Sequence, residues 1–358
     1  MDYNSIRRKS RKIKVGNLTV GGDSPVTIQS MTNTDTHDVE ATYAQIMSLK
    51  AAGCNIVRLA VPDIAAADTF RELKARGVDI PLVADIHFDY KIAIAAARAG
   101  ADKIRINPGN IGDRSKVKAV VDVCRELGLP IRIGVNSGSL EKHILAKHGA
   151  PTAEALAESA LFHAAMLEEL DFHDIAISVK ASDVTNMILA NRILAEKTSY
   201  PLHLGVTEAG ARLGAVVKSS VGIGALLAEG IGDTMRISLT DDPTEEVKVA
   251  KQILKSLDML TEGGMDIVSC PTCGRTKIGL IPLVEAFEKR VEAEGLSSKN
   301  IKVALMGCVV NGPGEAREAD IGIAGGIGEG LLFKKGEIIR KIPEDKLIDE
   351  LIEEIKKM

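Results

Sequence analysis

Residues 102–135 read DKIRINPGNIGDRSKVKAVVDVCRELGLPIRIGV and contain one strand–helix–strand unit. Between Val117 and Leu127, apolar residues recur at the spacing of one helix face, and Gly128 stands where that helix should end. The flanking runs, 102–106 and 130–135, are short and rich in isoleucine, which is typical of buried strands. This stretch therefore predicts two strands joined by a helix.

Strand-like runs of this kind recur eight times in the first 260 residues. They cover residues 26–31, 55–60, 81–86, 102–106, 130–135, 175–179, 201–206 and 234–239. Helical segments lie between them, and glycines such as Gly53 and Gly77 mark where helices should end. Eight strand–helix units in about 250 residues match the (β/α)8 TIM barrel in count and size. A doubly wound open sheet is the competing interpretation, but the regular repetition favours closure.

A second domain is expected where this repetition stops. Residues 258–264, DMLTEGG, have the composition of a linker. The elements expected beyond it are a short strand before Cys270, a helix at 277–294, strands at 301–306, 321–324 and 330–339, and a helix from Pro343. We therefore predict a substrate-binding TIM barrel over residues 1–260, followed by a small α+β domain over residues 264–358.

Composition and charge argue against several classes of protein. The chain has 45 Lys and Arg against 49 Asp and Glu, a net charge of -4, and no Trp, which is unlike a nucleic-acid-binding surface. Its longest uncharged stretch, 303–314, is too short to span a membrane. The N-terminal MDYNSIRRKSRK lacks the apolar segment of a secretory signal, so we expect a cytoplasmic protein. The basic run 7–14 is interpreted as a solvated arm, with an anion contact as the alternative.

Four of the predicted strands carry an arginine between two apolar residues: Arg58, Arg105, Arg132 and Arg236. Because side chains alternate along a barrel strand, the apolar neighbours face the helices and each arginine faces the lumen. The same alternation adds Asp85, His87, Asn107, Asn136, Lys180, His203, Thr207 and Ser238 to the lumen. The carboxyl ends of the strands, where TIM barrels place their active sites, are therefore expected to be polar and cationic.

The predicted lumen has an excess of positive charge. The four arginines and Lys180 face only Asp85 and the loop residue Glu208, which leaves three cations unmatched. Buried like charges need a counter-anion, and arginine is suited to bidentate binding of phosphate. A structural ion-pair layer is the alternative, but two carboxylates cannot neutralise five cations. For His87 and His203, an acid/base role and a simple hydrogen-bonded role both stay open.

Three cysteines in the second domain point to a metal or redox site. Cys270 and Cys273 form a CxxC pair, and Cys308 lies in a glycine-rich stretch. Zinc is disfavoured because a fourth ligand is lacking and no histidine follows His203. A thioredoxin-like pair would leave Cys308 without a role. Three thiolates match an iron–sulfur cluster whose fourth iron takes a carboxylate, water or substrate, and Glu315 is the natural carboxylate.

Motifs spread along the chain resemble one known family. They are QSMTNT at 29–34, ADIHF at 84–88, KIRINPGN at 103–110, RIGVN at 132–136, HLGVTEAG at 203–210, GDT at 232–234, SCPTCGR at 269–275 and GCVVNGPGE at 307–315. Together they resemble the 4-hydroxy-3-methylbut-2-en-1-yl diphosphate synthases of non-mevalonate isoprenoid biosynthesis. The chain is similar to the compact bacterial two-domain form, without the insertion of plant-type members.

The resemblance implies an iron–sulfur oxidoreductase acting on CH or CH2 groups. Its substrate would be 2-C-methyl-D-erythritol 2,4-cyclodiphosphate, which takes up two electrons, loses an oxygen as water and leaves as the linear hydroxylated butenyl diphosphate. The electrons would come from reduced flavodoxin or ferredoxin. The resemblance further implies a 4Fe-4S cluster on Cys270, Cys273 and Cys308, with Glu315 as the replaceable ligand.

The resemblance also assigns residues to the substrate. The diphosphate would be held by Arg58, Arg105, Arg132, Asn136, Lys180 and Ser269. The carbon skeleton would be surrounded by Asp85, His87, Asn107, His203 and Glu208. Arg236 and Ser238, which share the predicted lumen, are further candidates for substrate binding, and Asp85, His87, Glu208 and Glu315 are the candidate catalytic residues.

Two other functions are compatible with the same residues. An iron–sulfur hydratase or lyase would act on a phosphorylated substrate without net reduction, and a redox-sensing nucleic-acid binder would use the cluster structurally.

The linker between the two predicted domains bears on the oligomeric state. With about seven residues it spans at most about 25 Å, too short for an easy return of the second domain to the mouth of its own barrel. We therefore expect a head-to-tail homodimer with composite active sites, which the resemblance also implies.

Overall fold

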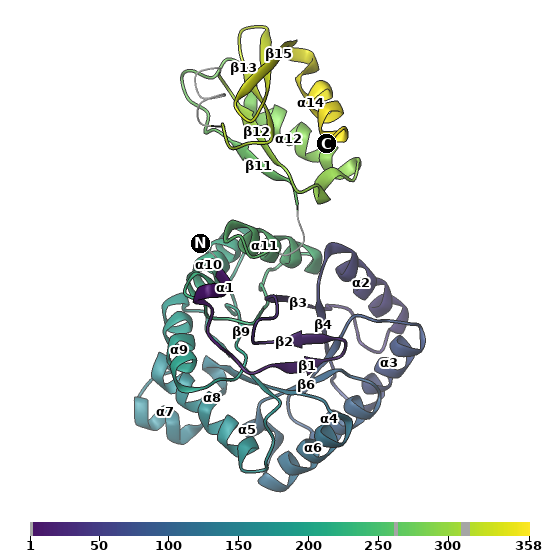
Figure 1. Cartoon of the computed structure of the whole chain (residues 1–358). Coiled ribbons are helices and arrows are strands. Elements are labelled where there is room, and N and C mark those ends of the chain that lie inside the picture. Colours follow the sequence, from purple (N-terminus) through teal and green to yellow (C-terminus); the bar gives the residue numbers. More distant parts are fainter. Residues whose placement is uncertain (1–2, 261–263, 309–315) are drawn as a thin grey trace. The chain divides into compact units, whose positions relative to one another are not determined.

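The computed structural model describes residues 3–260, 264–308 and 316–358 (Figure 1). The chain divides into two compact units, Met1–Leu260 and Thr261–Met358. No helix among the described residues is long and apolar enough to cross a membrane.

The first unit is a parallel barrel of eight strands, in the order β8-β7-β6-β5-β4-β3-β10-β9. The strands are β3 (Thr27–Met31), β4 (Ile56–Ala60), β5 (Leu82–Asp85), β6 (Lys103–Ile106), β7 (Ile131–Asn136), β8 (Ile175–Lys180), β9 (His203–Leu204) and β10 (Thr234–Met235). A bridge between Ile177 and Leu202 brings β8 to β9 and closes the ring. The predicted TIM barrel is confirmed, and the open sheet is wrong.

The last two strands are shorter than the sequence predicts. Runs of six residues were expected at 201–206 and 234–239, but each strand has two residues. Just beyond β9, Gly205 lies against the backbone oxygen of Arg236 and the side chain of Lys180. Single backbone hydrogen bonds continue beyond these strands, from the Arg236 N–H to the Leu204 carbonyl at 3.0 Å and from the Thr207 N–H to the Ala181 carbonyl at 3.2 Å.

Helices surround the strands (Figure 1). The larger ones are α2 (Val39–Ala52), α3 (Ile64–Ala75), α4 (Tyr90–Arg98), α6 (Arg114–Leu127), α8 (Ala153–Glu168), α9 (Val184–Lys197), α10 (Arg212–Ala228) and α11 (Pro243–Ser256). All but α10 begin after an Asp or Thr whose side chain accepts a backbone N–H of the first turn. Gly53 and Gly128 end α2 and α6 in the left-handed conformation that glycine adopts without strain.

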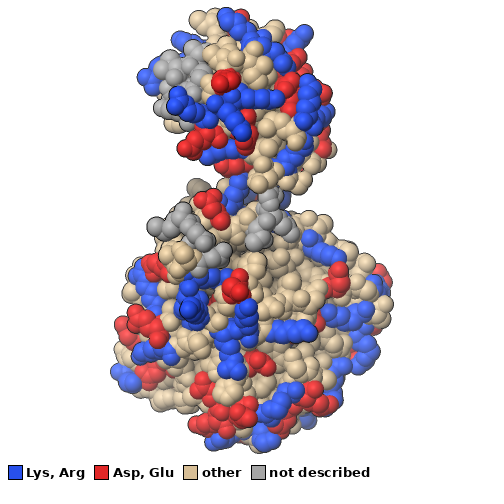
Figure 2. All heavy atoms as spheres, viewed as in Figure 1, with Lys and Arg blue, Asp and Glu red and all other residues tan. Residues whose placement is uncertain are grey.

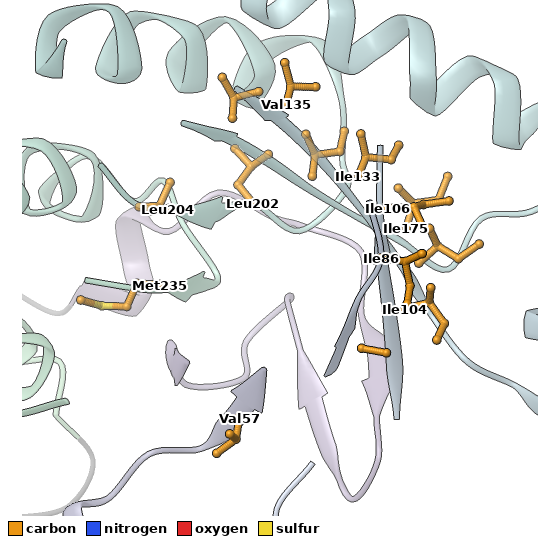
Figure 3. Close-up of a cluster of buried hydrophobic side chains, with 14 of the residues drawn as sticks. Val57, Ile86, Ile104, Ile106, Ile133, Val135, Ile175, Leu202, Leu204 and Met235 are labelled. Carbon is orange, nitrogen blue, oxygen red and sulfur yellow. The ribbon is translucent and has the colours of Figure 1, made fainter. Parts of the chain in front are cut away.

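Alternate residues of the strands pack against these helices. Figure 3 draws 14 side chains of this apolar cluster and labels ten of them, among them Ile104, Ile106, Ile133 and Val135. Because these residues face outward, Arg105 and Arg132 between them face the lumen.

A hairpin that the sequence did not predict closes the amino-terminal end of the barrel. It consists of β1 (Ile13–Val15) and β2 (Leu18–Val20), paired antiparallel, and it lies across the ring of strands (Figure 1). Its apolar side chains form one cluster with Ile56, Val83 and Ala176, the inward-facing residues near the amino ends of three strands. The lumen therefore has an apolar floor.

The segment before this hairpin corrects the expectation of a solvated arm. Arg7 and Arg8 are largely buried and pair with Asp233, with nitrogen–oxygen distances of 3.2 and 3.6 Å. Asp233 also accepts hydrogen bonds from Ser10 Oγ at 2.6 Å and from the backbone N–H of Leu202 at 2.9 Å. A basic run in sequence gives no sign of this one buried carboxylate, which ties the N-terminal segment to the barrel.

The second unit is the predicted α+β domain, with one sheet in the order β11-β12-β13-β14-β15, but the single strand expected at 330–339 is two strands joined by a turn at 335–336. Its elements are β11 (Asp266–Ser269), α12 (Leu280–Ala293), β12 (Lys302–Met306), β13 (Ile321–Gly325), β14 (Glu329–Lys334), β15 (Glu337–Pro343) and α14 (Leu347–Lys356). β11 to β13 are parallel, whereas β13 to β15 are antiparallel. Apolar side chains of both helices form one core with the sheet.

We predict that Asp233→Asn lowers the free energy of unfolding by about 3 kcal/mol, because it leaves two buried guanidinium groups without a carboxylate. Urea denaturation followed by circular dichroism measures the change. Asp23→Asn is the control, because Asp23 forms an exposed ion pair with Lys12 that should contribute under about 1 kcal/mol. Equal losses in the two variants would contradict the anchoring role of Asp233.

Candidate active site

Asp85 is the centre of the charged residues in the lumen. Its carboxylate accepts a hydrogen bond from Arg105 Nη1 at 2.9 Å. Arg58 Nε and His87 Nε2 lie 3.7 and 3.6 Å from its other oxygen. Burial would raise the pKa of Asp85, but Arg58, His87 and Arg105 together hold it well below its ordinary value. Asp85 is therefore an ionised carboxylate that orients three side chains.

Arg132 reaches across the lumen and forms no ion pair with a carboxylate in the described part of the chain. Its side chain is fully buried, and Nη1 donates to Gln29 Oε1 at 3.0 Å. Its Nε has no hydrogen-bond partner among the described residues. Burial lowers the pKa of Arg132 well below its ordinary value, and the charges of Arg58 and Arg105 lower it further. Burial likewise lowers the pKa of Arg58 to about 10.

Two inward-facing glycines make room for these cations. A Cβ at Gly134 would collide with the guanidinium of Arg105, and a Cβ at Gly205 would lie 2.7 Å from Lys180 Nζ. Asn136 and Lys180 stand side by side in the register of β7 and β8. The glycines therefore allow long cationic side chains to lie inside the lumen.

His203 and Asn107 complete the buried polar set. His203 is fully buried, with Nδ1 3.3 Å from Thr234 Oγ1. Burial lowers the pKa of His203 well below its ordinary value, and Arg132 and Lys180 lower it further, which favours the neutral ring. His203 Nε2 and Asn107 Nδ2 have no hydrogen-bond partner within the described part of the chain. Both atoms are available to a bound ligand.

Arg236 is neutralised by a carboxylate that the sequence analysis missed. Glu246, near the start of α11, is buried and lies 2.8 Å from Arg236 Nη2. It also accepts from Ser30 Oγ at 2.8 Å, while Arg236 Nη1 donates to Ser238 Oγ at 2.8 Å. Glu208, which we had counted as the second carboxylate, is exposed. No strand alternation could have identified Glu246, because it lies on a helix.

A lumen cation was missed as well. Lys103 opens β6 on the same face as Arg105 and Asn107, and it is fully buried. Lys103 precedes Arg105 by two residues, so the same strand alternation also predicts that Lys103 faces the lumen. Six cations therefore face the two carboxylates of Asp85 and Glu246 in the described lumen, and the excess of positive charge is larger than the sequence analysis predicted.

The mouth of the barrel is hollowed beside Asp85. A cavity of about 1050 Å³ lies between the loops after β3, β4 and β5, and Asp85, His87 and Phe88 contribute to its lining. His87 and Phe88 are both exposed. On the face of the first unit that Figure 2 shows, by contrast, Lys and Arg are interspersed with Asp and Glu. Charge of one sign is concentrated in the lumen.

In the second unit, two cysteines lie at the same edge of the sheet. Cys270 directly follows β11 and Cys308 follows the parallel neighbour β12, with Ser269 beside Leu305 in the register. The backbone N–H of Gly307 donates to Cys270 Sγ at 3.3 Å. Ser269 itself is exposed at the end of β11.

Cys273 is exposed, and a hydrogen bond from the Arg275 backbone and the charge of Arg275 lower the pKa of its thiol. Among residues 3–260, 264–308 and 316–358, no three metal-ligating side chains lie close enough together to hold an ion. Glu315 lies outside the described residues.

Both units match models of a single protein family. Residues 10–251 match the GcpE TIM-barrel domain, and residues 266–357 match the GcpE protein C-terminal domain. This chain belongs to the GcpE family. The resemblance read from the motifs is thereby confirmed, because curated proteins named 4-hydroxy-3-methylbut-2-en-1-yl diphosphate synthase (flavodoxin) are similar to this GcpE chain over almost its whole length.

The relative from Ruminiclostridium cellulolyticum is 61% identical over 98% of both chains. The one from Clostridium perfringens is 61% identical over 97% of this chain and 98% of its own. Among solved structures, the type I 3-dehydroquinate dehydratase of Clostridium difficile superposes with a TM-score of 0.51 at 14% identity, covering 70% of this chain and 98% of that one. At this identity, the likeness shows the fold alone.

We predict that Glu246→Gln lowers the free energy of unfolding by about 3 kcal/mol, because Arg236 then lacks its charged partner. Thermal and urea denaturation measure the loss. The neighbouring Glu245→Gln is the matched control, since Glu245 pairs with Arg212 and Lys248 on the outer surface and should contribute under about 1 kcal/mol. If the two variants are equally stable, Glu246 does not support the lumen.

Proposed function

We propose that this GcpE protein converts 2-C-methyl-D-erythritol 2,4-cyclodiphosphate into 4-hydroxy-3-methylbut-2-en-1-yl diphosphate in non-mevalonate isoprenoid biosynthesis. The observation that carries the proposal is 61% identity, over 98% of both chains, to a protein named for making this product. The reaction takes up two electrons and two protons, opens the ring at one carbon–oxygen bond and releases one water. This balance requires an external reductant.

The lumen supports the proposal because its charge suits a diphosphate. Arg58, Arg105, Arg132 and Lys180 converge there, and Asp85 is the carboxylate that lies within 4 Å of Arg58 and Arg105. Phosphate oxygens would accept from Arg132 Nε, which lacks a hydrogen-bond partner among the described residues. Each such charged hydrogen bond contributes about 1.5–3 kcal/mol to binding.

Other residues of the lumen would orient the carbon skeleton. Asn107 Nδ2 and His203 Nε2 are buried and have no hydrogen-bond partner among the described residues, so each would contact a hydroxyl oxygen of the substrate. Asp85 is ionised and orients His87, whose imidazole is more than half exposed at the mouth. His87 is therefore the lumen residue best suited to pass a proton from solvent.

The cysteines of the second unit fit an iron–sulfur cluster in two respects. An amide N–H already donates to Cys270 Sγ, and the pKa of the Cys273 thiol is lowered, which favours the thiolate of Cys273. Cys270, Cys273 and Cys308 would hold a 4Fe-4S cluster, with Glu315 as the fourth ligand. When bound, the cluster supplies electrons one at a time, and reduced flavodoxin, which the relatives' names specify, or ferredoxin is their source.

The test of function is turnover of the cyclic diphosphate by protein purified and reconstituted without oxygen. We expect the linear diphosphate to form only when a reductant such as dithionite is present, and iron and sulfide analysis to give about four of each per chain. A hydratase or lyase would need no reductant. Turnover without reductant, or zinc at full occupancy in anaerobic protein, would overturn this proposal.

We also propose a head-to-tail homodimer, in which each cluster domain serves the barrel of its partner. The linker between the units has about seven residues and spans at most about 25 Å. A return to the mouth of its own barrel would use nearly all of this length. Exchange between two copies gives two equivalent sites without that strain.

Mixing a Cys270→Ala chain with an Arg132→Ala chain tests this assembly. Each variant alone should be inactive, because one lacks a cluster ligand and the other a phosphate-binding cation. In the mixed dimer, one of the two composite sites keeps both halves, so activity should return to at most about half of that expected for the same number of intact dimers. If the subunits exchange and activity stays absent, each cluster serves its own barrel.

A further inference from the structure

Lys103 is an unusual residue for its place in the barrel. It is the first residue of β6, and its side chain is fully buried. Ile104 and Ile106 pack against the helices, so Lys103 shares the lumen face with Arg105. At the same end of the barrel, the inward-facing residues Ile56 and Val83 are apolar and pack on the hairpin. Lys103 interrupts this apolar floor.

The ammonium group of Lys103 has no partner among the described residues. Nζ forms no hydrogen bond there. The charged groups that act on it most strongly are Arg132 and Arg58, which are cations, and its neighbour Arg105 already occupies the carboxylate of Asp85. Burial, Arg132 and Arg58 together lower the pKa of Lys103 well below its ordinary value. Nothing in the described lumen offsets the cost of burying this group.

A lysine that only supports the fold is expected to be paired, and a nearby example shows how. Lys74 on α3 is partly exposed and lies 2.7 Å from Asp102, directly before β6. By contrast, an apolar residue of similar length in place of Lys103 would extend the apolar layer of Ile56 and Val83. The position of Lys103 therefore costs stability, which indicates a ligand that recovers it.

We propose that Lys103 is a further substrate-binding residue, whose ammonium group contacts the phosphate group that lies deepest in the lumen. The inference rests on the proposed function, because a diphosphate is the anion assigned to this lumen. Lys103 approaches from the floor, whereas Arg132 spans the lumen to Gln29 with its Nε still without a hydrogen-bond partner in the described structure. The two donors would hold phosphate oxygens from different directions.

The test compares Lys103→Met with the unsubstituted full chain, purified without oxygen. Calorimetry measures the Kd of the cyclic diphosphate and, separately, of inorganic pyrophosphate. We expect Lys103→Met to weaken both roughly ten- to hundredfold, as for loss of a charged hydrogen bond to phosphate. Without ligand, we expect its Tm to rise by a few degrees, because an unpaired buried amine is replaced by an apolar group of similar length.

Lys197→Met is the matched control, because Lys197 is exposed at the end of α9 and its loss changes the net charge equally. It should alter neither Kd. If methionine prevents folding, Lys103→Gln tests the same contact with a shorter neutral side chain. Unchanged affinity for both ligands, or a lower Tm with unchanged affinity, would show that Lys103 only supports the fold.

The Kd of pyrophosphate distinguishes failure of this inference from failure of the proposed function. If the unsubstituted chain binds pyrophosphate but not the cyclic diphosphate, the assigned substrate is wrong, while the effect of Lys103→Met on pyrophosphate still decides the role of Lys103. If the unsubstituted chain binds both and Lys103→Met binds both equally well, only the role of Lys103 is overturned. Binding of neither ligand would overturn both.

Discussion

Unmatched positive charge inside a closed barrel is the constraint on which the rest of the site depends. Two carboxylates, Asp85 and Glu246, face six cations in the described lumen. Each carboxylate is already committed, the first to Arg105 and the second to Arg236. Arg58 also lies 3.7 Å from Asp85, but Lys103, Arg132 and Lys180 form no ion pair among the described residues, so an anionic ligand supplies the largest favourable interaction available to them.

The apolar residues next to each strand arginine in the sequence hold it in place by packing against the helices. The residues before and after each strand arginine form the cluster between strands and helices, which fixes the direction of the arginine. Glycines at 134 and 205 then leave room for Arg105 and Lys180 inside. A rotation of any strand about its axis would bury the charge among the helices, so the packing of the outer layer determines the chemistry of the inner one.

The direction of the strand side chains could be predicted from sequence, because each side chain of a barrel strand faces either the helices or the lumen. An arginine between two isoleucines, as in residues 104–106, must face away from the helices. The same reasoning fails where a partner lies outside the strands. Glu246 pairs with Arg236 from a helix, and Asp233 pairs with Arg7 and Arg8, which are more than 200 residues away in the sequence. Such partners are specified by tertiary packing and leave no periodic signal.

The hairpin β1–β2 covers the lumen at the amino ends of the strands, opposite the mouth. Its apolar side chains close the amino ends of the strands against Ile56, Val83 and Ala176. For the proposed reaction, substrate and product therefore share one route, and the linear diphosphate must depart before another cyclic molecule enters. Release of the linear diphosphate through the mouth is therefore a step that every turnover must complete.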